Sequence, residues 1–151
     1  MTFMECAIKE ADEGIKKGEG GPFGAVIVRN GVIVGRGHNR VLLNKDPTCH
    51  GEMEAIRDAC RNLKTYDLSD CEIYTTAEPC PMCLGGILWA NIKKVYTGCD
   101  RKDTASIGFR DDKFYNYIEG KEDLLETQEV ERENCLELFE SYKKIENRQI
   151  Y

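Results

Sequence analysis

The stretch FGAVIVRNGVIVGRGHN, residues 23–39, limits the possible folds more than any other part of the chain. Two runs rich in β-branched residues flank Asn30-Gly31, a dipeptide that accepts the positive φ angles of a type I′ turn. The stretch therefore predicts a hairpin of two antiparallel strands, and the fold must contain a sheet.

Helical and strand patterns alternate on both sides of this hairpin. Apolar residues recur at helical spacing from Phe3 to Ile15, which predicts a first helix that ends near Gly18. The later expected elements are a helix over about 52–63, a strand over 71–76, a helix from about Pro81, a strand over 93–98 and helical pieces from Phe114 onward. This order predicts an α/β layered domain with a mixed sheet, which is parallel where helices cross over.

Length and composition set the class of protein. A chain of 151 residues is expected to be one domain over residues 1–151, because a chain of this size buries about two-thirds of its unfolded surface. The start MTFMECAIKEADEGIKK is charged throughout and lacks the apolar run of a signal peptide or membrane span. We therefore expect a cytoplasmic protein without membrane contact, whose eight cysteines are reduced thiols. The net charge of −6 argues against nucleic acid as a partner.

Two motifs supply metal-binding side chains. TTAEPCPMCLGG carries Cys80 and Cys83, which alone could be a redox pair or a structural metal site. CHGE, residues 49–52, places His50 thirty residues before Cys80. One imidazole and two thiolates make three ligands, and catalytic zinc sites typically use three protein ligands and leave the fourth position to water.

Glu52, in the same CHGE motif, is the candidate base of such a site. Two thiolates neutralise the formal charge of Zn²⁺, so a bound water is less acidic than beside three neutral imidazoles, and a nearby base becomes valuable. A carboxylate that takes a proton from water can deliver protons to a ring nitrogen and to a departing amine. Hydrolytic deamination requires these transfers.

H-x-E followed by P-C-x-x-C is the signature of zinc-dependent nucleobase deaminases. Over residues 21–117 the chain resembles the cytidine-deaminase-like superfamily. This resemblance implies a three-layer α/β/α fold with a central mixed five-stranded sheet. It also implies one zinc ion per subunit, with His50, Cys80 and Cys83 as ligands and Glu52 as the proton shuttle.

The segments GGPFGAVIV, DPTCHGE and EPCPMCLGGILWA are most similar to the bacterial guanine deaminase branch, which implies hydrolysis of guanine to xanthine and ammonia. Gly51 departs from this branch, where alanine is commoner, and matches the fungal cytosine deaminases. Cytosine or another aminated heterocycle is therefore the alternative substrate, followed by adenosine in tRNA. A catalytically silent zinc-binding domain is the alternative outside the enzymes, although the intact Glu52 favours catalysis.

The same resemblance assigns further residues to the substrate. In GFRDDKFY, residues 108–115, Asp111 matches a second catalytic acid near the reacting amine, with Asp112 as the competing neighbour and a surface turn as the alternative. Asn39 matches an amide that binds the base edge. Phe23 and Trp89 match aromatic positions that line the pocket, although either could be a core residue instead.

The C-terminal end is assigned by resemblance as well. In the guanine deaminase branch, the C-terminal segment, about 120–151 here, crosses to the partner subunit of a homodimer. The terminal tyrosine helps to close the site, which gives this role to Tyr151. The other histidine, His38, has no cysteine partner or H-x-E context and is interpreted as a surface or packing residue.

Overall fold

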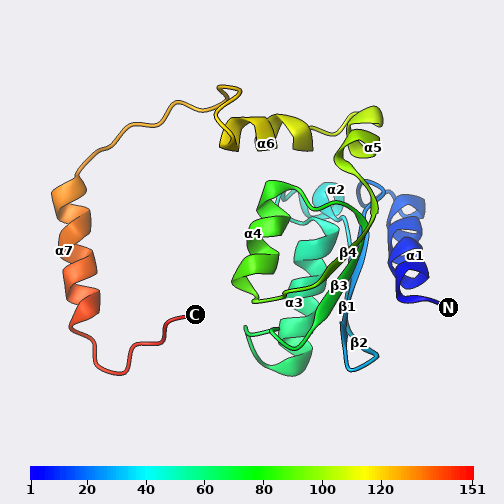
Figure 1. The fold of residues 1–151 in the computed structure, drawn as a ribbon, viewed down its shortest axis with the longest axis horizontal. Helices are drawn as coiled ribbons and strands as arrows, with labels where there is room; N and C mark the ends of the chain where they lie inside the picture. Colours follow the sequence, from blue (N-terminus) through cyan, green and yellow to red (C-terminus); the bar gives the residue numbers. More distant parts are fainter.

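The computed structural model describes residues 1–151 and contains seven helices and four strands (Figure 1). No helix has both the length and the apolar character needed to cross a membrane. In chain order the elements are α1 (Phe3–Lys16), β1 (Gly24–Arg29), β2 (Val32–His38), α2 (Val41–Asn44), α3 (Gly51–Leu63), β3 (Glu72–Ala77), α4 (Pro81–Trp89), β4 (Val95–Cys99), α5 (Arg101–Ser106), α6 (Asp111–Ile118) and α7 (Arg132–Lys143).

The strands form one mixed sheet in the order β2-β1-β3-β4. β1 pairs antiparallel with β2 and with β3, whereas β3 pairs parallel with β4 across the helix α4. Asn30 and Gly31 have φ angles of 50° and 76°, the left-handed region that a type I′ turn requires. The predicted hairpin and the parallel crossover are therefore both confirmed.

The expectation of a five-stranded sheet is wrong for this chain, because the sheet has four strands. After β4 the chain turns directly into α5 and α6, and residues 121–131 form no element that pairs with β4. The outer edge of β4 therefore has no partner strand, and its last three residues, 97–99, are exposed.

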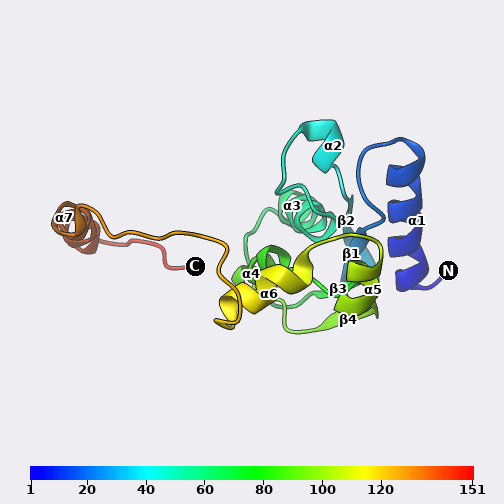
Figure 2. The same ribbon diagram turned by 90° about the horizontal axis from the view of Figure 1, so that it is seen from above.

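Helices cover both faces of the sheet, so the three-layer α/β/α arrangement is confirmed (Figure 2). α1 packs on one face, where Val26 and Val28 contact Ala7, while α3 and α4 cover the opposite face. Because side chains alternate along a strand, Ala25 and Ile27 point into this second layer. The larger core cluster lies there and consists of Ala25, Ile27, Ala55, Ala59, Leu68, Cys71, Ile73, Ile87, Ala90 and Ile92.

The C-terminal arm, residues 119–151, leaves this layered body. Figures 1 and 2 show α7 well separated from the sheet and from the other helices. The apolar side chains of Leu138 and Phe139 on α7 are 68% and 63% exposed. Only the end of the chain returns, where the ring of Tyr151 lies 5.9 Å from that of Trp89 and 6.1 Å from that of Tyr66.

Candidate active site

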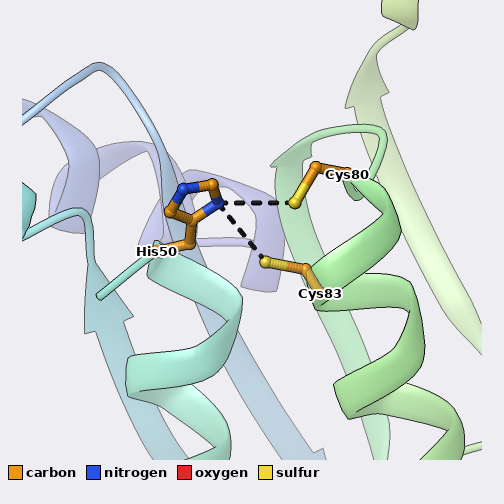
Figure 3. Close-up of side chains that lie close together, drawn as sticks. All are labelled: His50, Cys80 and Cys83. Carbon is orange, nitrogen blue, oxygen red and sulfur yellow. Dashed lines mark hydrogen bonds between the residues drawn. The ribbon is translucent and has the colours of Figure 1, made fainter. Parts of the chain in front are cut away.

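The three predicted metal ligands converge where two helices begin. His50 is the N-cap of α3, Cys80 is the N-cap of α4, and Cys83 lies in the first turn of α4. His50 Nδ1 is 3.5 Å from Cys80 Sγ and 3.6 Å from Cys83 Sγ (Figure 3). All three candidate ligand atoms lie within 4.8 Å of one another.

These distances fit a tetrahedral zinc ion. With Zn–N near 2.05 Å and Zn–S near 2.3 Å, a tetrahedral angle separates the nitrogen from each sulfur by about 3.6 Å. The two measured separations, 3.5 and 3.6 Å, agree with this value. One imidazole and two thiols, both buried, also have the chemistry that zinc prefers. The arrangement therefore suits Zn²⁺ with a fourth position left for water.

The two thiols differ in their affinity for protons. The hydrogen bond from Cys83 lowers the pKa of Cys80 to about 4, while this interaction and burial raise the pKa of Cys83. Without a metal, the pair therefore keeps one proton. Binding of a divalent cation releases this proton, since thiolates are the zinc ligands. The positive ends of the α3 and α4 dipoles favour the anionic form.

Glu52 lies beside the ligands in the first turn of α3. Its side chain is buried and lines the same cavity as His50 and Cys80. Burial raises the pKa of Glu52 to about 7, because the charged form loses its hydration. A carboxyl group with a pKa near neutrality can both accept and return a proton at working pH, as a proton shuttle must.

A cavity of about 600 Å³ opens over these groups. It brings together three other predicted site residues: Phe23, Asn39 and Asp111. The ring of Phe23 meets the ring of Phe109 edge to face, with centroids 4.8 Å apart and planes at 83°. These two rings form an aromatic wall of the kind that packs against planar molecules.

Asn39 is buried at the end of β2 with its amide beside the cavity. The side-chain Oδ1 of Asn39 accepts a hydrogen bond of 3.1 Å from the Val41 backbone N–H. The backbone N–H of Asn39 donates to the Phe23 carbonyl. The side-chain NH₂ group is therefore left as a donor for a molecule in the cavity.

Asp111, rather than Asp112, lines the cavity. Burial raises the pKa of Asp111, and the nearby Cys80 adds to this effect. The Tyr115 hydroxyl donates a 2.5 Å hydrogen bond to the Pro79 carbonyl, and the Arg101 guanidinium lies 4.3 Å from the centre of the Tyr115 ring. These contacts hold α6, which begins at Asp111, against the residues just before Cys80.

Trp89 and Tyr151, two further predicted substrate-binding residues, do not lie at the cavity. α4 begins at the cavity, and nine residues at 1.5 Å per residue carry Trp89 about 13 Å along the helix from Cys80. The Trp89 ring is 67% exposed and packs against Tyr151 instead. Within a single chain, neither ring reaches the metal ligands.

Several cavity residues were not predicted from the sequence, among them Phe109, Arg110 and Phe114. All three belong to GFRDDKFY, where they flank the candidate acid. Aromatic residues on both sides of a candidate acid were the available signal.

The sequence and the fold are similar to those of known proteins. Residues 1–99 match the model of the cytidine and deoxycytidylate deaminase zinc-binding region. Guanine deaminase of Bacillus subtilis is 42% identical over 99% of this chain and 97% of its own length, and its X-ray structure covers 99% and 96% of the two chains with a TM-score of 0.93. The structure of a guanine deaminase from Nitrosomonas europaea is 30% identical in sequence and has a TM-score of 0.69, and the match covers 72% of this chain and 63% of that chain. A tRNA-specific adenosine deaminase of Aquifex aeolicus is 46% identical, over 66% of each chain.

Proposed function

The chain belongs to the cytidine and deoxycytidylate deaminase family of zinc-dependent enzymes, and from this premise we propose that it hydrolyses guanine to xanthine and ammonia. One observation carries the choice of guanine. The guanine deaminase of Bacillus subtilis is 42% identical over 99% of the chain, and its structure has a TM-score of 0.93, whereas a tRNA-specific adenosine deaminase of Buchnera aphidicola that matches 94% of the chain is 38% identical. The match to the guanine deaminase includes Asp111 and the C-terminal arm.

The residues around the cavity divide the proton transfers. Zinc, when bound, supplies a Lewis acid that makes water nucleophilic at neutral pH. Glu52 would accept the two protons of the attacking water one after the other, and would deliver the first to the ring nitrogen and the second to the leaving amine. The amine of guanine lies between two ring nitrogens, so Asp111 can bind it and relay a proton that Glu52 does not reach alone.

The remaining cavity groups suit a planar purine. The wall formed by Phe23 and Phe109 packs against the ring, and the NH₂ group of Asn39 donates to an acceptor on the base edge. The Asn39 donor and the Asp111 carboxylate have fixed positions in the cavity. A base with a different pattern of donors and acceptors would therefore leave one of the two without a hydrogen-bond partner.

A panel of substrates tests this proposal. Zinc-loaded protein is incubated with guanine, cytosine, adenine, an aminated triazine and tRNA, and ammonia release and ultraviolet absorbance are followed. We expect kcat/KM for guanine to exceed the others by at least about 10²-fold, because a mismatched base leaves buried polar groups unpaired. Activity on cytosine without activity on guanine would establish the alternative substrate. No ammonia from any base, with zinc bound, would indicate a silent zinc domain.

Asp111→Asn and Asp112→Asn form a matched pair for the second acid. Only Asp111 lines the cavity, so its amide variant is expected to lower kcat for guanine by roughly 10²-fold, while Asp112→Asn changes kcat by less than about threefold. Steady-state kinetics of both variants measure the difference. Similar losses in the two variants would rule out a specific role for Asp111.

We further propose a homodimer in which residues 120–151 of each chain pack on the partner, with Tyr151 closing the partner's cavity. A twelve-residue helix is marginal alone in water, yet α7 leaves Leu138 and Phe139 exposed. The unpaired edge of β4 offers a place where an incoming segment could add a strand.

Light scattering during size-exclusion chromatography should therefore give twice the mass of one chain. The double variant Leu138→Asp, Phe139→Asp should give the mass of a single chain, because the charges prevent burial of α7. Tyr151→Ala should remain a dimer and show a higher KM for guanine. A wild-type protein that is fully active as a monomer would rule out the packing of residues 120–151 on a partner chain.

A further inference from the structure

His38 is neither a surface nor a simple packing residue, because it is buried between two carboxylates. It is the last residue of β2 and is 3% exposed. Its Nδ1 lies 3.2 Å from Oε2 of Glu10 on α1, and its Nε2 lies 2.5 Å from Oε2 of Glu19 in the loop after α1. The histidine therefore joins the second strand to two separate segments of the N-terminal region.

Each of the two carboxylates beside this imidazole also pairs with an arginine. The Arg40 guanidinium lies 3.5 Å from Glu19 Oε2 on the solvent side, and Arg36 reaches Glu10 at 3.9 Å. The hydrogen bond from His38 lowers the pKa of Glu19, so this carboxylate is ionised at neutral pH. The ring also lies against α1 where only glycine fits, because a Cβ at Gly14 would be 2.6 Å from His38 Cδ2.

The contact between His38 and Glu19 lies one residue from the cavity on both sides. Glu19 precedes Gly20, His38 precedes Asn39, and both following residues line the cavity. The Glu19 carbonyl accepts hydrogen bonds of 3.0 and 3.1 Å from the N–H groups of residues 42 and 43. A Cβ at Gly20 would lie 2.1 Å from Asn39 Oδ1, so the two segments touch directly. Movement of Glu19 would therefore move Asn39 and the wall beside it.

We propose that His38 and Glu19 act as positioning residues. They hold Asn39, and the segment 20–23 that carries Phe23 of the aromatic wall, in place for the nucleobase. This inference rests on the proposed function only for the identity of the base. Neither residue lines the cavity, so both act through Asn39 and the wall. Their effect should fall on substrate binding rather than on proton transfer, which belongs to Glu52 and Asp111.

Glu19→Ala and Glu10→Ala form a matched pair, because both remove a carboxylate from His38 but only Glu19 adjoins the cavity. For Glu19→Ala we expect KM for guanine to rise by about 10-fold with kcat within about threefold and zinc content unchanged, since misplaced binding groups weaken binding. For Glu10→Ala we expect KM within about twofold, whatever the change in Tm. Glu19→Gln keeps the side-chain length and a hydrogen bond, and should restore most of the affinity.

Amide hydrogen exchange of the peptide covering residues 39–43 gives a readout that needs no substrate. In Glu19→Ala the N–H groups of residues 42 and 43, which bond to the Glu19 carbonyl, should exchange at least several-fold faster than in Glu10→Ala. If KM rises equally in Glu19→Ala and Glu10→Ala, or if their amide hydrogens exchange equally fast, the proposal is wrong and His38 has only a structural role. If the wild type releases no ammonia from guanine, the proposed function fails while the exchange comparison still decides this inference.

Discussion

Glu52→Gln is expected to lower kcat for guanine by roughly 10²- to 10⁴-fold, the range typical for loss of a general acid and base. The variant keeps the size of the side chain but removes the group that accepts and returns protons. Burial raises the pKa of Glu52 to about 7, which suits this carboxyl group to accepting and returning protons. We therefore expect that no neighbouring carboxylate fully replaces Glu52. Ammonia release and zinc analysis of the same preparation provide the measurement.

Glu54→Gln is the control for this experiment. Glu54 occupies the same first turn of α3, but it pairs with Arg57 at 2.5 Å and does not line the cavity. The kcat of Glu54→Gln should stay within about threefold of wild type, because this partly exposed ion pair lies outside the cavity. Zinc content should be unchanged in both variants. A Glu52→Gln enzyme with near-normal turnover would exclude Glu52 as the proton shuttle.

Removal of zinc is expected to abolish activity to below about 1%, because Glu52 alone cannot replace the Lewis acid that lowers the pKa of the attacking water. Dialysis against a chelator should remove the metal, and one equivalent of Zn²⁺ per chain should restore turnover. Cys83→Ala should bind zinc weakly or not at all, since three ligands fall to two.

Cys60→Ala is the matched cysteine control. Cys60 is partly buried on α3 beside the core and belongs to no cluster of metal ligands, so its loss should leave the zinc content at one per chain. Persistent activity in protein shown to be free of zinc would contradict the assignment. A disulfide between Cys80 and Cys83 in the active protein, with no bound zinc, would instead support the redox alternative.

The candidate zinc ligands could be predicted because the H-x-E and P-C-x-x-C signature marks them, and local rules place this signature in the fold. A proline at the start of α4 and the turn before α3 place Cys80 and His50 at helix N-termini, where short-range sequence signals are strongest. The hairpin at Asn30-Gly31 follows from the same kind of local preference. The alternation of helices and strands then leaves few ways to bring these helix starts together.

Features that depend on distant partners could not be predicted in this way. The burial of His38 requires Glu10 and Glu19, which are 28 and 19 residues away, so its neighbours in sequence carry no signal. The placement of Trp89 depends on how far α4 extends from the cavity, which the residue type does not reveal. The missing fifth strand depends on where the chain goes after β4, and a polar, charged segment specifies no direction.

The order of functional residues along the chain bears on how such enzymes can change during evolution. His50, Glu52, Cys80 and Cys83 all precede residue 99, whereas Asp111 and the C-terminal arm follow it. Mutations, insertions or replacements after residue 99 can therefore alter Asp111, the proposed second acid, and the C-terminal arm while leaving the candidate metal ligands untouched. A chain arranged in this way can acquire a new substrate without first losing the means to activate water.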